Sequence, residues 1–178
     1  NNYTDMRDFS GEDQLAAEDG CSVFAIKNQN MNISGQTWDM HGSAIPYVLI
    51  LEVEYPEPTA ILTVVGCLGL AGINASGLNV CINNMHCYEV SENGLMWPAL
   101  VRGMLQKPNA LQAADYLKTH LPSSGHSSQL SDKENSLNFE TTGKSISMTS
   151  QIQKEGAHFH TNHYVGSLKD QEILDRQS

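Results

Sequence analysis

Two residues near the start of the chain combine the chemistry of a nucleophile with that of a carboxylate. Cys21 directly follows Gly20, and Asp39 comes eighteen residues after Cys21. A cysteine by itself is more often a small buried side chain than a nucleophile. The segments 22–27 and 33–39 are typical of the two strands of a hairpin, whose open ends lie together. The spacing therefore predicts an Asp39 carboxylate beside the Cys21 thiol, a partner that offsets the cost of placing a carboxylate in a strand.

A second group of polar residues lies near the end of the chain, where His158, His160 and His163 surround Asn162. Three histidines could bind zinc, but no paired Asp, Glu or Cys lies near them in the sequence, and we assign neither a metal nor a cofactor to the chain. On an alternating strand, Asn162 shares one face with His158 and His160. We interpret Asn162 as the functional residue and the histidines as support for its strand.

Strands are predicted to position both groups. The β-branched runs 47–55 and 59–65 are separated by the turn 56–58, which contains two prolines, and they predict a second hairpin. A third hairpin is predicted across 70–84, with the turn at 74–77.

Helical patterns follow these hairpins. One is predicted at 98–106, with Pro98 in its first turn, and another at 110–120. The serine-rich and charged segment 123–135 predicts an exposed loop. Three further strands are predicted at 136–141, 145–151 and 158–165. This order favours an α+β domain with mostly antiparallel sheets over a parallel doubly wound fold.

The composition narrows the classes of partner. The chain has 178 residues, of which 40% are hydrophobic and 17% charged, so we expect one globular domain. Its net charge of −10, with basic residues scattered along the chain, disfavours nucleic acid as a partner. No apolar run reaches the ~20 residues that span a bilayer, and no signal peptide is visible, so we expect no membrane partner and favour a cytoplasmic location. A homo-oligomer is compatible with the sequence.

Four motifs occur in a fixed order along the chain. They are D-G-C-S at 19–22, G-Q-T-W-D at 35–39, the turn 72–77 leading to N-N at 83–84, and H-T-N-H at 160–163. Their order and spacing resemble the acyl-coenzyme A:6-aminopenicillanic acid acyltransferase family, which is itself similar to bile salt hydrolases and penicillin V acylases. The resemblance extends from about residue 1 to the end of the chain.

The resemblance implies the fold of the N-terminal-nucleophile hydrolases, an αββα four-layer sandwich. It implies that residues 1–20 are the remnant of a leader and that 21–178 form the hydrolase core. The family continues beyond the H-T-N-H motif with further strands and a late active-site arginine, a role that we do not assign to Arg176. We therefore expect the fold to be incomplete at both ends.

The resemblance also implies a mechanism. Members cleave themselves before the nucleophile, here between Gly20 and Cys21, and the freed α-amine then acts as the general base for the thiol. The pKa values of an α-amine, ~7.7 to 8.0, and of a thiol, ~8.5, are close enough for this proton exchange. By resemblance Asp39 orients the Cys21 groups, while the Asn162 amide and the Asn84 backbone N–H bind the oxyanion.

The expected reaction is cleavage of an amide bond in a small acylated substrate through an acyl-enzyme on Cys21. We favour hydrolysis over acyl transfer because water is always available as acceptor. Bile salt hydrolases have an arginine where this chain has Gln36, which makes that branch less fitting. Two alternatives stay open: an inactive fragment or interaction protein, and a metal-binding module built on His158, His160 and His163.

Overall fold

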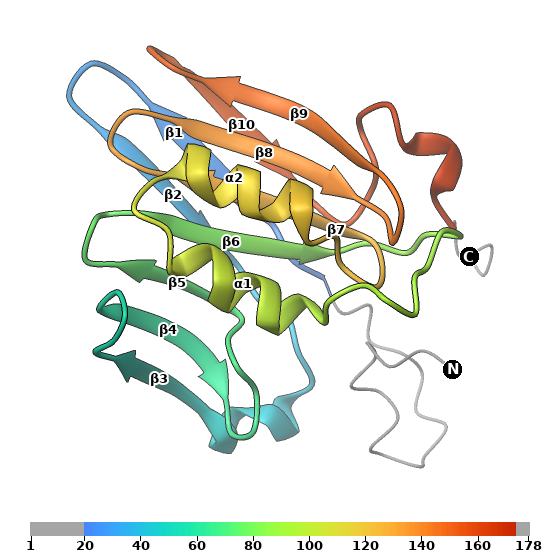
Figure 1. Ribbon diagram of the computed structural model, residues 1–178, viewed down its shortest axis with the longest axis horizontal. Helices are drawn as coiled ribbons and strands as arrows, with labels where there is room; N and C mark the ends of the chain where they lie inside the picture. Colours follow the sequence, from blue (N-terminus) through green and yellow to red (C-terminus); the bar gives the residue numbers. More distant parts are fainter. Residues whose placement is uncertain (1–19, 174–178) are drawn as a thin grey trace.

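Ten strands form two antiparallel sheets in the computed structural model, which describes residues 20–173 (Figure 1). The larger sheet contains, in this order, β3 (Val48–Val53), β4 (Thr59–Val64), β5 (Ala71–Asn74), β6 (Asn79–Asn84), β7 (His126–Ser131), β8 (Ser136–Thr141) and β9 (Ile146–Ile152). The smaller sheet has the order β10 (Gly156–His160), β1 (Val23–Lys27) and β2 (Asn32–Gln36). The first and last strands of the described chain thus pair in one sheet, which brings distant motifs together.

Two helices, α1 (Trp97–Leu105) and α2 (Ala110–Thr119), lie side by side on one face of the larger sheet (Figure 1). Pro98 occupies the first turn of α1, where no backbone N–H is needed. The side chain of Asn109 caps α2 by accepting a hydrogen bond from the backbone N–H of Gln112 at 2.9 Å. Both helices therefore begin at residues whose types favour a helix start.

The apolar core lies between these helices and the larger sheet. Its helical side chains include Leu100, Met104 and Leu117, which are almost completely buried. Leu130 on β7 and Leu137 on β8 face them from the sheet. Because each fully buried aliphatic side chain of this size contributes about 2 kcal/mol, this layer supplies much of the stability of the domain.

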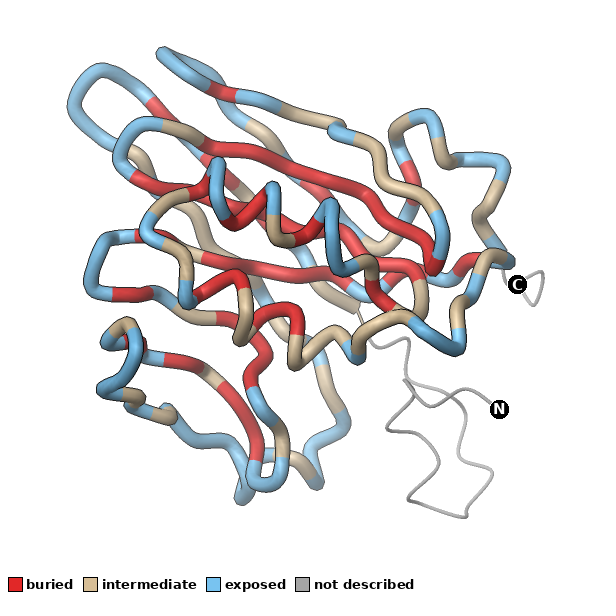
Figure 2. Tube along the Cα trace, viewed as in Figure 1, coloured by how far each residue is buried: buried red, intermediate tan, exposed pale blue. Residues whose placement is uncertain are grey.

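The layer between the two sheets is polar. Every residue of β7 and β8 is buried, because helices cover one face of these strands and the smaller sheet covers the other (Figure 2). Since Leu130 and Leu137 face the helices, Gln129 and Asn138 face the smaller sheet. These side chains bond to one another: Asn138 donates to Ser127 at 3.1 Å and to Gln129 at 3.4 Å. Such mutual hydrogen bonding is what permits polar side chains to be buried.

The fold class predicted from the sequence is confirmed: the described residues form a mixed α/β structure, with large antiparallel sheets and two α-helices. The three predicted hairpins correspond to the pairs β1–β2, β3–β4 and β5–β6. Within residues 20–173 the layers are helices, larger sheet and smaller sheet, and the second helical layer of an αββα sandwich is not among them. The predicted leader, apart from Gly20, and Arg176 lie outside the described residues.

One predicted loop is wrong. The segment 123–135 contains β7, a completely buried strand in the middle of the larger sheet. Its sequence, H-S-S-Q-L-S, has the composition of an exposed loop. The strand is stable inside because its polar side chains face the polar layer between the sheets, which a pattern of apolar and polar residues does not reveal.

The last predicted strand is too long. We expected a strand over 158–165, but β10 ends at His160, and Asn162 lies in the turn that follows. Asn162 therefore does not share a strand face with His158 and His160. The turn forms because the backbone N–H groups of Val165 and Gly166 bond to the buried Glu140 carboxylate instead of to a neighbouring strand.

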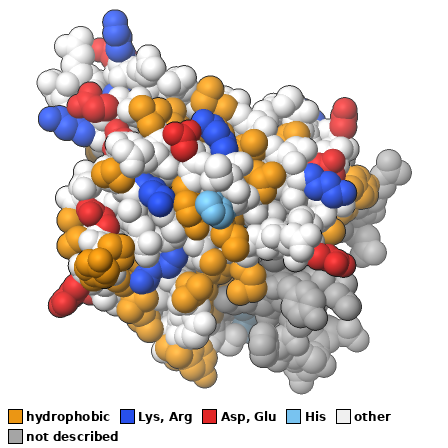
Figure 3. Space-filling view, viewed as in Figure 1, with side chains coloured by type: hydrophobic (Ala, Val, Ile, Leu, Met, Phe, Trp, Pro, Cys, Tyr) orange, Lys and Arg blue, Asp and Glu red, His pale blue; other side chains and the backbone are white. Residues whose placement is uncertain are grey.

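The helix-bearing face carries charges of both signs, interspersed with hydrophobic side chains (Figure 3). Hydrophobic side chains gather at the lower edge of this view, near the start of β3, where Ile45 is 74% exposed and Tyr47 is 58% exposed. Over the described part of the chain, no helix has the length and hydropathy to cross a membrane.

Candidate functional site

The β1–β2 hairpin places Asp39 beside the Gly20–Cys21 peptide. Beyond the paired strands, the backbone N–H of Thr37 donates to the Ser22 carbonyl at 2.8 Å. The backbone N–H of Asp39 donates to the Gly20 carbonyl at 2.9 Å. The structure thus brings Asp39 to the bond that the sequence predicts to be cleaved, with its side chain exposed to solvent.

Asn162 reaches Cys21 from the opposite end of the chain. Its Oδ1 accepts a hydrogen bond from the backbone N–H of Cys21 at 2.7 Å. Its Nδ2 donates to the backbone carbonyl of Asn84 at 2.8 Å. Because the Cys21 N–H can only donate and the Asn84 carbonyl can only accept, the contacts allow one orientation of the amide. Among the described residues, Asn84 is the acceptor of Nδ2, and the second Nδ2 hydrogen can donate elsewhere.

The backbone N–H of Asn84 points to the same edge of β6 as its carbonyl. The N–H of Ile82 on this strand donates to Oε1 of Gln36 at 2.8 Å, away from β7. Residues two apart in a strand direct their N–H groups to the same side. The Asn84 N–H therefore faces the edge on which Asn162 lies, next to Cys21. The structure brings together the four residues singled out from the sequence: Cys21, Asp39, Asn84 and Asn162.

Asn83, next to Asn84 on β6, contacts three backbone carbonyls with one side chain. Its Nδ2 lies 3.0 Å from the Cys21 carbonyl oxygen, 3.2 Å from that of His160 and 3.2 Å from that of Thr161. Asn83 is completely buried. One amide thus joins the start of β1, the end of β6 and the end of β10.

A buried pair of side chains, Glu140 and His160, holds the turn that carries Asn162. The Oε1 of Glu140 on β8 lies 2.9 Å from Nε2 of His160, and neither side chain is exposed. The same carboxylate accepts hydrogen bonds from the backbone N–H groups of Val165 at 2.6 Å and Gly166 at 3.0 Å. Burial raises the pKa of Glu140, but the hydrogen bonds from His160, Val165 and Gly166 outweigh burial, and the net pKa is lowered. Glu140 therefore fixes both ends of the turn that carries Asn162.

His160 is held at both ring nitrogens by acceptors. Besides the Nε2 contact with Glu140, its Nδ1 lies 2.6 Å from the backbone carbonyl oxygen of Thr161. Both ring nitrogens of His160 are thus occupied by contacts within the protein, which leaves neither of them directed at a substrate.

The histidines do not converge on one point. His163 contacts a different carboxylate, Glu172, at 2.6 Å, while His160 contacts Glu140. Burial, followed by the positive charge of His160, lowers the pKa of His158. In the part of the chain that the structure describes, no group of three or more His, Cys, Asp or Glu side chains could hold a metal ion.

The thiol of Cys81, which lies between the two sheets, is unsuited to nucleophilic attack. It is 2% exposed, and burial raises its pKa to about 12. A thiol with this pKa carries a negligible fraction of thiolate at neutral pH. Cys21, at the end of the sheet, is only half-buried.

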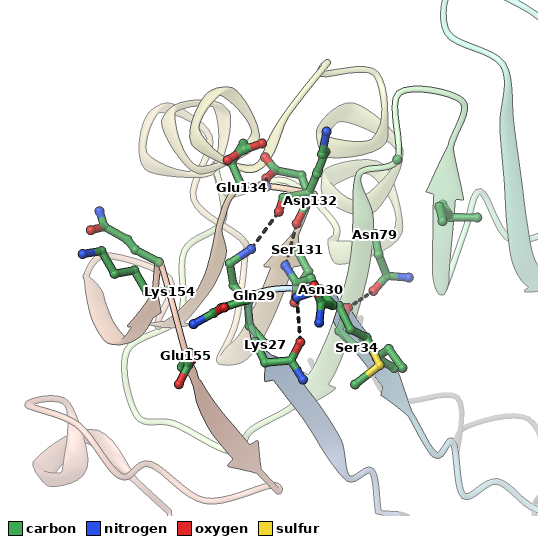
Figure 4. Close-up of a pocket in the computed structure, with 18 residues that line it drawn as sticks. Lys27, Gln29, Asn30, Ser34, Asn79, Ser131, Asp132, Glu134, Lys154 and Glu155 are labelled. Atoms are coloured by element: carbon green, nitrogen blue, oxygen red, sulfur yellow. Dashed lines mark hydrogen bonds between the residues drawn. The ribbon is translucent and has the colours of Figure 1, made fainter.

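A cavity of about 1140 Å³ lies at the other end of the sandwich (Figure 4). It is lined by the turns β1–β2, β7–β8 and β9–β10, including Lys27, Asp132 and Lys154. Lys27 ends β1, whereas Cys21 precedes it, and six residues of extended chain span about 20 Å. The cavity is therefore not part of the candidate site.

Sequence reasoning missed Glu140 as a site residue and did not find the contacts of Asn83. The available signal is weak: Glu140 occupies an alternating polar position in β8, which is also typical of a strand with one solvent face. Glu140 is recognisable as a site residue only once the structure shows that the smaller sheet buries that face of β8.

Comparison with known proteins identified a matching protein family and a distantly similar solved structure. Comparison with curated protein sequences gave no match. Among solved structures, a penicillin V acylase from Agrobacterium tumefaciens is similar with a TM-score of 0.43 and 14% identity, over 76% of this chain and 44% of that chain. The chain thus spans less than half of the length of that protein.

The family profile described as acyl-coenzyme A:6-aminopenicillanic acid acyl-transferase matches residues 26–178. The matched region includes Asp39, Asn84 and Asn162 and begins after Cys21. This match covers most of the 178 residues and agrees with the family predicted from the motifs. The chain belongs to the acyl-coenzyme A:6-aminopenicillanic acid acyl-transferase family.

Proposed function

We propose that this chain carries the catalytic centre of a cysteine amidohydrolase or acyltransferase, which cleaves itself before Cys21 and then cleaves an amide bond in a small acylated substrate. The observation that carries the proposal is the contact of Asn162 with both the Cys21 N–H and the Asn84 carbonyl. This contact places the Cys21 thiol close to two groups that can donate hydrogen bonds to an oxyanion, the Asn162 side-chain amide and the Asn84 backbone N–H.

Self-cleavage begins with the Cys21 thiolate, whose sulfur attacks the carbonyl carbon of Gly20. The carbonyl oxygen gains the negative charge, and the Asp39 N–H that already bonds to it stabilises that charge. The C–N bond then breaks, the Cys21 nitrogen takes up the proton that the thiol has lost and leaves as an amine, and a thioester remains. Water hydrolyses the thioester, releasing the leader as a carboxylate and restoring the thiol.

The cleaved form uses its new α-amine as the general base. The amine occupies the place of the Cys21 N–H, where Oδ1 of Asn162 accepts one of its hydrogens. It takes the proton of the Cys21 thiol, and the thiolate attacks the substrate carbonyl. The C–N bond of the substrate then breaks, the leaving amine departs with the proton that the Cys21 amine returns, and an acyl-enzyme remains. The oxyanion lies between the second Nδ2 hydrogen of Asn162 and the Asn84 N–H, and the exposed Asp39 carboxylate favours the protonated amine.

The acceptor of the acyl group distinguishes a hydrolase from an acyltransferase. Water completes hydrolysis by attacking the acyl-enzyme, while an amine in its place completes acyl transfer. We favour hydrolysis because the candidate nucleophile is only half-buried and water reaches it without a binding site.

The test is the intact mass of the purified protein beside its Cys21→Ala variant, with Cys67→Ala as a matched control at another half-buried thiol. We expect cleavage before residue 21 in the wild type and in Cys67→Ala, and an uncleaved Cys21→Ala. The cleaved proteins are then assayed for release of amine from a panel of acyl amides. An uncleaved wild type, or cleavage of Cys21→Ala, would contradict the proposal.

A further inference from the structure

We propose that Asn83 is a positioning residue, which holds Cys21 against the turn that carries Asn162; its effect on turnover rests on the proposed function. The Nδ2 of Asn83 lies 3.0 Å from the carbonyl oxygen of Cys21 and 3.2 Å from that of Thr161. It therefore contacts the residue of the nucleophile and the residue directly before Asn162.

The position of Asn83 makes this contact a link between three segments. Asn83 is separated from Cys21 by 62 residues and from Thr161 by 78 residues. Its neighbour on β6 is Asn84, whose carbonyl receives the Asn162 amide. A shift of Asn83 would therefore displace the thiol, the Asn162 amide and the Asn84 N–H relative to one another. Rates of enzymes are sensitive to displacements of about 1 Å among such groups.

The hydrogen bonds of Asn83 gain importance when the chain is cut. In the uncut chain the Gly20 carbonyl is held by the Asp39 N–H, which fixes the chain on the amino side of Cys21. Cleavage removes that connection and makes Cys21 the first residue, and terminal residues are poorly ordered unless they are tied down. Its backbone then keeps the contacts with Asn162 at the amine and with Asn83 at the carbonyl.

The unpaired atom of Asn83 supports a role for its N–H groups. Oδ1 of Asn83 is buried and has no hydrogen-bond partner among the described residues. An unpaired buried acceptor is unfavourable and rare. An apolar side chain of similar size would avoid it, so the presence of an amide here is explained by the carbonyls that Nδ2 holds.

Asn138 provides a matched control. It is likewise completely buried and lies in the polar layer between the sheets, on β8. Its Nδ2 donates only to the side chains of Ser127 and Gln129 and does not contact the site. Substituting leucine at either position removes one buried amide of the same size, but only Asn83→Leu removes a hydrogen bond to the Cys21 carbonyl.

The experiment compares Asn83→Leu, Asn138→Leu and the wild type by Tm, kcat, KM and the rate at which iodoacetamide alkylates Cys21 in the folded protein. We expect both variants to lower the Tm to a similar extent. Asn83→Leu should lower kcat about 10- to 100-fold with a smaller effect on KM, and should raise the alkylation rate of Cys21 severalfold as its carbonyl is released. Asn138→Leu should leave both rates within about threefold of the wild type.

The inference is overturned if Asn83→Leu retains the wild-type kcat and alkylation rate, or if Asn138→Leu changes them equally. Should Asn83→Leu fail to fold, Asn83→Ser, which keeps one donor on a shorter side chain, gives the same comparison. The alkylation rate needs no turnover. A wild type without activity therefore contradicts the proposed function, whereas an unchanged alkylation rate contradicts the role of Asn83.

Discussion

The side-chain oxygen of Asn162 accepts a hydrogen bond from the backbone N–H of Cys21 at 2.7 Å, although 141 residues separate the two. The contact is possible because β1 and β10 are neighbours in the smaller sheet, where Val23 pairs with His160. The strand β1 begins two residues after Cys21, and β10 ends two residues before Asn162. The pairing of the first and last strands thus decides the geometry of the site.

Removing the donor of Asn162 should reduce the rates of self-cleavage and of turnover. Asn162→Asp keeps Oδ1 for the Cys21 N–H but replaces Nδ2 by an oxygen that faces the Asn84 carbonyl. We expect kcat to fall by ~10² to 10³, as for other losses of one oxyanion donor. Steady-state kinetics and intact mass measure the two effects. Asn30→Asp, at an exposed position in the β1–β2 turn, is the charge-matched control. If Asn162→Asp kept a kcat within threefold of the wild type, Asn162 would not be an oxyanion donor.

Asn84 should act through its backbone, so its side chain should be dispensable. We expect Asn84→Ala to keep kcat within about threefold, because the N–H and carbonyl of residue 84 remain. Asn84→Pro removes that N–H, which faces away from β7, so the β6–β7 ladder stays intact. Turnover should then fall at least ~10²-fold with circular dichroism unchanged. Equal kcat values for the two variants would show that the Asn84 N–H has no role.

Acid should weaken the buried pair of Glu140 and His160. The pKa of Glu140 in the folded protein is below its ordinary value of 4.5, so its stabilising contribution is complete above pH 4.5 and is lost as the pH falls through the lowered pKa. Glu140→Gln leaves His160 without a charged partner and should lower the free energy of unfolding at neutral pH by about 3 to 5 kcal/mol.

Urea unfolding at pH 7 and at acidic pH measures this effect. His163→Gln, which disrupts the pair with Glu172 at a side chain that is 70% exposed, should change the free energy by less than about 1 kcal/mol. If Glu140→Gln were as mild as His163→Gln, the buried pair would not be what holds the Asn162 turn.

His126 should make the protein less stable between pH 6.5 and pH 4. Burial is the main cause that lowers its pKa from 6.5 to about 4, while a hydrogen bond with the Ser124 carbonyl acts in the opposite direction. Over this range the unfolded chain takes up a proton that the folded protein does not, so the free energy of unfolding falls by about 3 kcal/mol.

His126→Asn removes the titrating group while keeping a donor for the Ser124 carbonyl. Its unfolding free energy should therefore fall less between pH 7 and pH 4 than that of the wild type, whatever its absolute stability. The same substitution at His86, an exposed position, should leave the wild-type slope unchanged. A steep acid slope in His126→Asn would assign the effect to another group.

The sequence by itself determined the local elements and the family. Alternation of apolar residues, the two prolines at 56–58 and Pro98 in a first helical turn are local signals, and the predicted hairpins and helix are found where these signals lie. The four motifs led to the family because the order and spacing of chemically distinctive residues can be read without a structure. The spacing from Cys21 to Asp39 also placed the two residues together, since a hairpin folds locally.

Tertiary structure alone decided which polar residues are buried. The strand β7 has the composition of a loop, yet it is stable inside the larger sheet because its polar side chains find hydrogen-bonding partners on the neighbouring strand β8, on the face that the smaller sheet covers. The turn at Asn162 likewise depends on Glu140, which is distant in sequence and buried only when both sheets meet. A buried polar group is stable only with its partners in place, and the chain brings those partners together only by folding.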